Sequence, residues 1–295
     1  MSKIKNIYCF GTSFTAGGGF EWETNDRQRS YLLNTYYKNT PEPKKQFHYS
    51  WPGHLDKLLK DVSIHNLAKQ GYGNDTIFRK CFDIVRDRNF DKDSSLFLFE
   101  FSQFGRKEFY YNKIKDYVIC NYMHSYDNIT QVDVGHSYYY DDSDMNQKLD
   151  ELQPILESYM KNTFDEMSEY HKMSRDISFF LNWITSNKFN TIFVSEPKIY
   201  YEEDRKVIDL YPQIDYELSS DNNCFDIVSF ITDGFRIKDE TDNKFDDFHA
   251  GYETNKYISK LVFNKLVEMG YINQNKFDLE VEYNKAKNSK YNSDK

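Results

Sequence analysis

The sequence repeatedly places a short apolar segment before a polar turn and a helical pattern. The clearest examples are residues 4–10, 62–66 and 95–101, and a fourth segment, TIFVSEP, stops at Pro197. The segment at 95–101 is mainly apolar, as expected of a strand whose two faces are both covered by helices. Strands that alternate with helices predict a mostly parallel sheet between helical layers. We therefore expect an α/β protein with a three-layer α/β/α fold.

The expected helices are marked by apolar residues at helical spacing. Asn74 is expected to cap the helix that follows 62–66, and Ser174 to cap the helix that precedes TIFVSEP. The other expected helices cover about 52–60, 147–169 and 252–269. Residues 225–231 are apolar, but their pattern does not distinguish helix from strand.

A chain of 295 residues suits one large α/β domain or two small ones. We interpret residues 1–273 as a single domain that carries an insertion at about 107–172. The insertion contains acidic, tyrosine-rich stretches such as YYYDDSD and is expected to be helical and aromatic. Residues 274–295 form a polar C-terminal tail that we expect to fray.

Composition excludes several classes of function. The net charge is −9 and no run of Lys or Arg stands out, so no nucleic-acid partner is expected. No apolar stretch approaches the length of a membrane span, and the N-terminus lacks a signal-peptide pattern. We therefore expect a cytoplasmic protein with no membrane partner.

Metal and redox chemistry find little support in the sequence. None of the four cysteines forms a C-x-x-C pair, and Cys9 and Cys81 are expected to be small core residues. The histidines do not have the spacing of a metal site. We therefore expect no metal and no cofactor.

Glycine usage singles out two turns. The chain has only 12 glycines, yet four lie at positions 11, 17, 18 and 19, and two more are Gly71 and Gly73. Ser13 lies in the first of these turns, at the carboxyl end of the segment 4–10, where active sites of parallel sheets form. Its hydroxyl is expected to be accessible, beside backbone N–H groups that can bind an oxyanion. The alternative is a serine that only caps the next helix.

A histidine and a carboxylate lie just before the last expected helix. In the segment Asp246-Asp247-Phe248-His249, the carboxylate of Asp246 can bind one imidazole nitrogen and leave the other facing outward. Such an arrangement orients the ring and stabilises its cationic form. The alternative is a solvated histidine in a loop.

Taken together, the three segments resemble the SGNH/GDSL hydrolase family. GTSFTAG resembles its first block, with Thr12 where Asp is usual, NLAKQGYGN resembles its second, and DDFH resembles its last. The resemblance covers residues 4–104 and about 174–269 and implies a flavodoxin-like α/β/α fold. It implies Ser13 as nucleophile, His249 as base and Asp246 as its partner. It also implies an oxyanion hole made by the N–H groups of Ser13 and Gly71.

The third block of the family, G-x-N-D, is not present. The segment at this place is EFSQFGR, so either Gln103 or Ser102 is expected to supply the side-chain donor of the oxyanion hole. Asn74 and Arg106 are the candidate substrate contacts. For Arg106, the favoured interpretation is a surface ion pair with Glu108.

Two functions follow from this reading. The first is a serine esterase that acts on a small acyl ester, with an O-acetyl group on a glycan as the preferred substrate. The second is a catalytically degenerate SGNH-like module for binding or assembly. Abundant Lys, Asn, Tyr and Phe with few Gly and Pro are compatible with an AT-rich genome, such as that of a phage. The second function would allow a homo-oligomer or a place in a virion.

Overall fold

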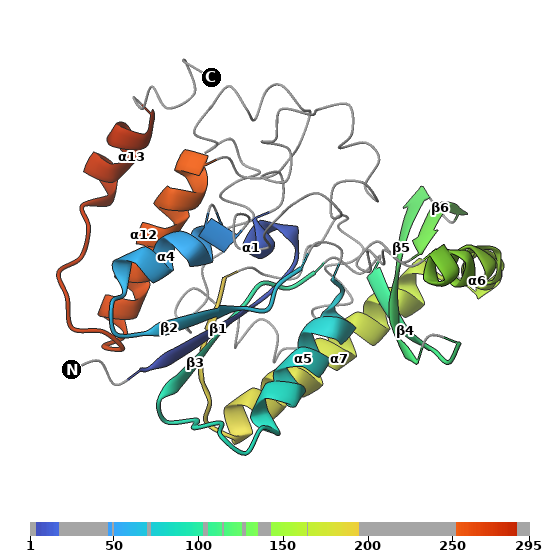
Figure 1. Cartoon of the computed structure of the whole chain (residues 1–295), viewed down its shortest axis with the longest axis horizontal. Helices are drawn as coiled ribbons and strands as arrows, with labels where there is room; N and C mark the ends of the chain where they lie inside the picture. Colours follow the sequence, from blue (N-terminus) through green and yellow to red (C-terminus); the bar gives the residue numbers. More distant parts are fainter. Residues whose placement is uncertain are drawn as a thin grey trace.

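The computed structural model places most of the residues that it describes in helices and strands (Figure 1). It describes residues 4–17, 47–48, 50–69, 72–102, 106–113, 115–125, 128–134, 143–163, 165–194 and 252–287. The strands are β1 (Asn6–Phe10), β2 (Ser63–Asn66), β3 (Ser95–Phe99), β4 (Arg106–Tyr111), β5 (Asp116–Ser125), β6 (Asn128–Val134) and β7 (Asn190–Phe193). The helices are α1 (Ser13–Ala16), α4 (Trp51–Leu58), α5 (Asn74–Val85), α6 (Ser143–Thr163), α7 (Glu166–Ser186), α12 (Tyr252–Glu268) and α13 (Leu279–Lys287).

The central sheet has four strands in the order β2-β1-β3-β7, and all of its neighbouring pairs are parallel. Helices cover both faces: α4 and α12 pack on one, and α5 and α7 pack on the other (Figure 1). The predicted α/β class with a mostly parallel sheet is therefore confirmed. The arrangement is compatible with the expected three-layer α/β/α fold.

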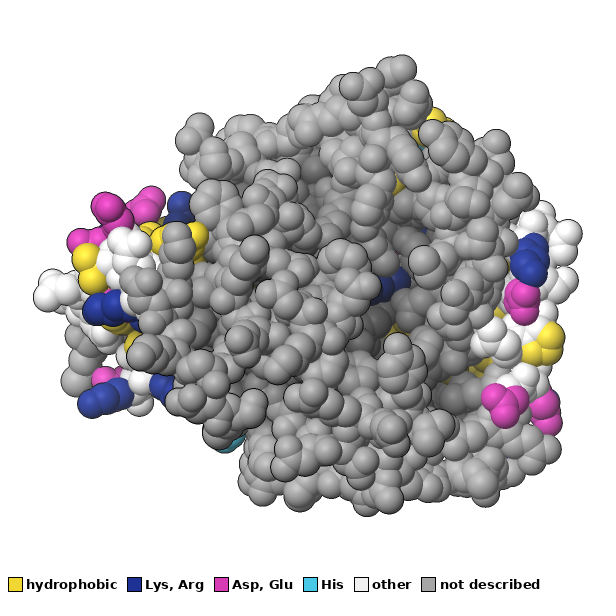
Figure 2. Space-filling model, turned by 90° about the horizontal axis from the view of Figure 1, so that it is seen from above, with side chains coloured by type: hydrophobic (Ala, Val, Ile, Leu, Met, Phe, Trp, Pro, Cys, Tyr) yellow, Lys and Arg dark blue, Asp and Glu magenta, His cyan; other side chains and the backbone are white. Residues whose placement is uncertain are grey.

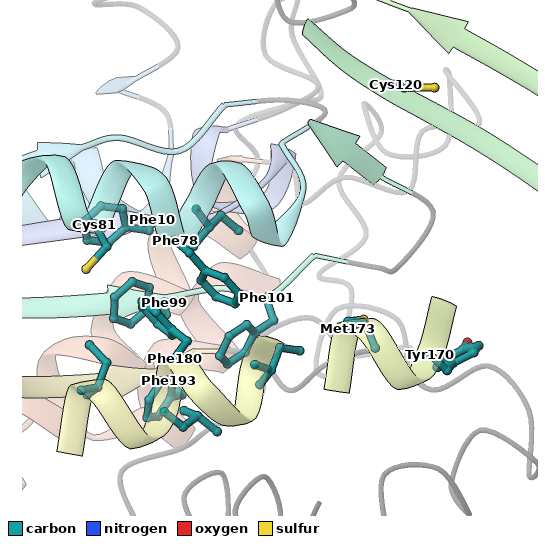
Figure 3. Packing of buried hydrophobic residues seen from close by; sticks show 14 of the residues in the cluster. Phe10, Phe78, Cys81, Phe99, Phe101, Cys120, Tyr170, Met173, Phe180 and Phe193 are labelled. Carbon is teal, nitrogen blue, oxygen red and sulfur yellow. The ribbon is translucent and has the colours of Figure 1, made fainter. Parts of the chain in front are cut away.

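The two faces of the sheet have different chemistry because side chains alternate along a strand. On β3, Leu96 and Leu98 face an aliphatic core with α4 and α12, whereas Phe97 and Phe99 face an aromatic core with α5 and α7. Figure 3 shows the aromatic core, in which Phe99 stacks on the ring of Phe10 with centroids 4.9 Å apart. Burying each such ring contributes about 1.5–3 kcal/mol.

The cysteines that the structure describes lie in these buried regions. Cys9 and Cys81 are buried free thiols, which confirms the prediction that they are core residues, and Cys120 on β5 is buried as well. Burial raises the pKa of the Cys9 and Cys81 thiols far above the usual value, because it disfavours the thiolate. Neither thiol is therefore a nucleophile near neutral pH.

The insertion at about 107–172 contains an expected helix, α6, and also strands that the sequence did not predict. Strands β4, β5 and β6 form an antiparallel sheet in that order, and the register of β5 and β6 shifts between Met123 and His124. Helix α6 packs on β6 (Figure 1). The strands were not predicted because their tyrosines and charged residues do not show the alternation of apolar and polar residues that marks a half-buried strand.

The expected helix at 147–169 and the helix capped by Ser174 are also corrected. Helix α6 ends at Thr163, and α7 begins at Glu166. Asp165 is the N-cap of α7, and its carboxylate accepts a hydrogen bond from the Ser168 N–H at 2.8 Å. Ser174 is buried within α7 and caps nothing.

The C-terminal segment does not fray at Gln274. It is bound to α12 through Asn264, whose side chain exchanges two hydrogen bonds of 2.8 Å with the backbone of Phe277. Helix α13 follows, and its Glu282 forms an ion pair with Lys260 on α12. The apolar segment at 225–231 and Pro197 lie outside the described residues.

The surface of the described part is mixed in charge. On the face seen in Figure 2, acidic and basic side chains lie close together at both ends. Ion pairs in the described part include Lys285–Glu282 on α13 and Lys161–Glu157 on α6. Among the described helices, none combines the length and the apolar character that crossing a membrane requires.

Candidate active site

Ser13 lies at the carboxyl end of a central strand. Strand β1 ends at Phe10, and Ser13 is the first residue of the short helix α1, with Thr12 as its N-cap. The helix ends at Gly17, whose φ of 84° is in the left-handed region that favours glycine. Ser13 is only 4% exposed, so its side chain is largely covered and the expectation of an accessible hydroxyl is corrected. The first glycine-rich turn thus lies where the sequence predicted it.

The neighbouring strands bring their own turns to the same edge. In the parallel register, Cys9 pairs with Asn66 on β2 and Phe10 pairs with Phe99 on β3. The residues that follow these strands therefore emerge beside the Ser13 turn. They are the candidates for shaping a site around its hydroxyl.

Glu100, directly after β3, holds the Ser13 turn. It is 1% exposed, and its Oε2 atom accepts hydrogen bonds from the N–H groups of Thr12 at 3.1 Å and Thr15 at 2.9 Å. Its Oε1 atom accepts a hydrogen bond from the Thr12 hydroxyl. A Cβ atom on Gly11 would lie 2.5 Å from Oε2, so the close approach of the carboxylate requires glycine there. The carboxylate thus binds the turn on both sides of Ser13.

Sequence reasoning missed Glu100. The signal was present, because a glutamate follows the apolar run SLFLF at the point where the chain reaches the candidate site. Burying a carboxylate costs free energy unless hydrogen-bond donors surround it, so a buried glutamate indicates a polar site that supplies such donors. Thr12, which stands where the resembling family usually has Asp, supplies one of those donors.

The turn after β2 is joined to the Ser13 turn. Asn66 donates a hydrogen bond from Nδ2 to the Thr15 carbonyl at 3.0 Å and accepts one from the Ala68 N–H at 3.2 Å. The Lys69 N–H donates to the Gly11 carbonyl at 3.3 Å. This places the described chain beside the Ser13 turn as far as Lys69, two residues before Gly71.

Asn74 fixes the end of β3 rather than capping α5. The N-cap of α5 is Gly73, and the Asn74 side chain is buried. Its Oδ1 atom accepts the Ser102 N–H at 2.8 Å, and its Nδ2 atom donates to the Ser102 carbonyl at 3.0 Å. The expected cap is therefore corrected, and the role that the structure gives Asn74 is positional. Contact between Asn74 and a substrate stays a prediction.

Ser102 carries a hydroxyl with unused bonding capacity. The residue is 1% exposed, and its Oγ atom has no hydrogen-bond partner among the described residues. Buried hydroxyls are usually satisfied, so an unsatisfied one beside a candidate site is a donor available to a ligand. The backbone of Ser102 is meanwhile fixed by Asn74.

The expected surface pair of Arg106 with Glu108 does not form. Glu108 is bound by Arg79 on α5, with contacts of 2.6 and 2.8 Å, and by the Thr76 hydroxyl at 2.9 Å. The Glu108 carboxylate is shielded because α5 packs over it. A shielded carboxylate needs a cationic partner, and Arg79 supplies that charge. A terminal nitrogen of Arg106 instead lies 3.5 Å from the Tyr72 carbonyl. Its contact with a substrate stays a prediction.

Helix α12 follows the segment DDFH in the sequence, and the N-terminus of this helix lies at the same edge of the sheet. The Asn255 side chain, in its first turn, accepts a hydrogen bond from the Trp51 N–H at 2.9 Å and so joins the N-termini of α12 and α4. His54 lies on the same end of α4, and burial with the nearby charges of Lys57, Lys256 and Lys260 lowers its pKa to about 3. It therefore remains neutral at neutral pH.

The described residues include four of the predicted site residues, namely Ser13, Asn74, Ser102 and Arg106. Four others, Gly71, Gln103, Asp246 and His249, lie outside the described residues. Within the described ranges, no group of three or more His, Cys, Asp or Glu side chains is placed to hold a metal ion.

The chain matches no protein-family model, and no curated protein matches it significantly.

Proposed function

We propose that the protein is a serine ester hydrolase of the SGNH/GDSL type, with Ser13 as its nucleophile. The observation that carries the proposal is the placement of Ser13 on the first residue of α1, at the carboxyl end of a central parallel strand. A buried carboxylate holds this turn from both sides. Such a turn presents a serine beside backbone N–H groups, which is the arrangement that acyl transfer requires.

In the proposed reaction, the Ser13 hydroxyl attacks the carbonyl carbon of an acyl ester while His249 accepts its proton. The tetrahedral intermediate collapses, the C–O bond to the alcohol breaks, and the imidazolium returns the proton to the leaving oxygen. Water then attacks the acyl-enzyme by the same route and releases the carboxylic acid. Asp246 orients the imidazole and stabilises its positive charge.

The position of α12 supports His249 in this role. Helix α4 precedes the parallel strand β2 and runs against it, so its N-terminus lies at the carboxyl edge of the sheet. The hydrogen bond between Trp51 and Asn255 brings the start of α12 to the same edge. His249 stands three residues before Tyr252, and three residues span at most about 11 Å. The start of α12 thus gives the chain before it a short path to the edge where Ser13 lies, and this supports His249 as the base.

The oxyanion would be bound by the N–H groups of Ser13 and Gly71 and by one side chain. The buried Ser102 hydroxyl, which has no partner in the described structure, supports Ser102 as that donor, and Gln103 stays the alternative. A hydroxyl in place of the usual asparagine amide is a chemically adequate donor. Removing one donor from an oxyanion hole typically lowers the rate about 100- to 1,000-fold, so this substitution bears directly on turnover.

The proposed substrate is a small acyl ester, with an acetyl ester of a carbohydrate as the preferred case. This preference rests on analogy with the resembling family and not on described residues. The altered third block favours a second candidate, a non-catalytic module of the same architecture that binds or assembles. The two candidates differ in whether Ser13 is chemically activated.

A fluorophosphonate probe followed by mass mapping of the adduct tests this difference. The expected result is one adduct on Ser13 in the unaltered protein, and none in Ser13→Ala. Ser63→Ala is the matched control, because Ser63 is an exposed serine at the start of β2, and its variant should be labelled normally. A folded protein that takes no probe on Ser13 and hydrolyses no acyl ester would refute the hydrolase and support the binding module.

A further inference from the structure

We propose that Glu100 is the positioning residue of the nucleophile, acting through the hydrogen bonds that hold the Ser13 turn. The inference rests on the proposed function, since it assigns a role within the same site. Glu100 touches neither of the reacting groups in the proposed chemistry. It acts on Ser13 through Thr12 and Thr15, which flank that residue in the sequence.

The first argument is the arrangement of donors around the carboxylate. One oxygen, Oε2, accepts the N–H groups of both Thr12 and Thr15, so the turn is tied at two points on either side of Ser13. The other oxygen accepts the Thr12 hydroxyl. These bonds take up two N–H groups of the turn and do not involve the N–H of Ser13, which the oxyanion hole requires.

The second argument is that Glu100 is itself fixed by the central sheet. Its N–H donates to the Phe10 carbonyl at 2.9 Å, which continues the pairing of β3 with β1. On the other side of β3, the Val194 N–H donates to the Phe99 carbonyl at 2.7 Å. The carboxylate therefore transmits the rigidity of the sheet to the short helix α1, which has only four residues of its own.

The third argument is that the carboxylate has no competing task in the described structure. No described Lys, Arg or His side chain forms an ion pair with Glu100, in contrast to Glu169, a buried glutamate on α7 that binds Lys107 at 2.8 Å and Lys172 at 2.6 Å. A buried carboxylate is stabilised only by the groups that bind it. For Glu100, the described groups of this kind all belong to the Ser13 turn.

Two substitutions separate hydrogen bonding from charge. Glu100→Gln preserves the pattern, because the amide oxygen can accept both N–H groups at the place of Oε2 while Nε2 donates to the Thr12 hydroxyl oxygen. Glu100→Leu is similar in size but leaves the buried N–H groups of Thr12 and Thr15 without an acceptor. Glu169→Leu is the matched control, since it removes a comparably buried glutamate that binds Lys107 and Lys172 instead of the Ser13 turn.

The test combines amide exchange of residues 10–17 with the rate of fluorophosphonate labelling per folded molecule. In Glu100→Leu, exchange at Thr12 and Thr15 should become at least about tenfold faster. Labelling of Ser13 should slow by about 100-fold, because misplacing a reacting group by about 1 Å costs that much. Glu100→Gln should recover the rate to within about tenfold of the unaltered protein, since a neutral bond is about half as strong. Glu169→Leu should change neither measurement.

Labelling and exchange at the original rates in Glu100→Leu would overturn the proposal, and so would a Glu100→Gln variant as impaired as Glu100→Leu. If Glu100→Leu does not fold, Thr12→Val is compared with Thr12→Ser. Faster exchange and slower labelling in Thr12→Val than in Thr12→Ser support the proposal, and equal behaviour overturns it. An unaltered protein whose Ser13 takes no probe refutes the hydrolase itself, whereas exchange still reports whether Glu100 holds the turn.

Discussion

Replacing Thr12 by aspartate should destabilise this protein or displace its Ser13 turn. Aspartate is nevertheless the usual residue at this position in the SGNH/GDSL family, which the sequence resembles. The Thr12 hydroxyl donates a hydrogen bond to the buried carboxylate of Glu100. Thr12→Asp removes that donor and places a second carboxylate against the first. The substitution therefore converts an attractive contact into a repulsive one inside the described site.

The magnitude follows from the two contributions. A hydrogen bond to a charged group is worth about 1.5–3 kcal/mol. Two like charges about 4 Å apart repel by about 4 kcal/mol at an effective dielectric constant near 20. The sum, roughly 5.5–7 kcal/mol, is comparable to the whole stability of many domains, about 5–15 kcal/mol. We expect Thr12→Asp to lose most of its folding stability or to move the Ser13 turn away from Glu100.

Urea unfolding at pH 7 measures the first outcome, and fluorophosphonate labelling of Ser13 measures the second. Thr12→Asn is the matched control, because asparagine has nearly the shape of aspartate but is neutral and can donate to Glu100. The difference between the two variants should shrink as the pH is lowered, because protonation of a carboxyl group removes the like-charge repulsion. A Thr12→Asp protein as stable and as reactive as Thr12→Asn at pH 7 would refute the reasoning.

Three further predictions concern separate parts of the site. Ser13→Ala and His249→Ala should each abolish most hydrolysis of a short-chain acyl ester, and the double variant should be little worse than either, since the pair acts as a unit; additive losses in steady-state kinetics would contradict this. Asn74→Ala leaves the buried backbone of Ser102 without its partner and should cost about 1–3 kcal/mol in urea unfolding. Burial lowers the pKa of His54 to about 3 in the folded protein, so below about pH 6.5 only the unfolded chain takes up the proton. The folding stability should therefore fall as the pH falls below about 6.5, by up to roughly 1.4 kcal/mol per pH unit. A His54→Gln variant should flatten that loss in a pH series of unfolding curves, and an unchanged slope would contradict the assignment.

The parts of the fold that the sequence predicted depend on local patterns. The position of Ser13 follows from an apolar run that ends at a glycine, and both features lie within ten residues of each other. The helices α5 and α12 follow in the same way from apolar residues at helical spacing. These local patterns predict the elements correctly because no contact with a distant residue overrides the local preference.

The parts that the sequence did not predict depend on partners far away in the chain. Asparagine is a residue type favoured at helix N-caps, but the side-chain amide of Asn74 binds Ser102, which lies 28 residues later in the chain. This tertiary contact overrides the local preference. Helix α13 is polar in composition, and it is held by an ion pair between Glu282 and Lys260 and by a ring contact between Tyr283 and Tyr257. Neither partner can be identified from the sequence of the helix itself.

The departure of the first block from the pattern of the SGNH/GDSL family can be explained by a single contact. Thr12 replaces the usual aspartate of the first block, and Glu100 lies at the end of β3, where the third block would begin. These residues are 88 positions apart, yet the hydroxyl of one donates to the carboxylate of the other. A carboxylate at both positions would place two negative charges together in a buried site, so a glutamate at 100 favours a neutral donor at 12. The carboxylate of Glu100 at the end of β3 therefore explains why the first block has Thr12 in place of aspartate. This replacement is not by itself a sign of a lost active site.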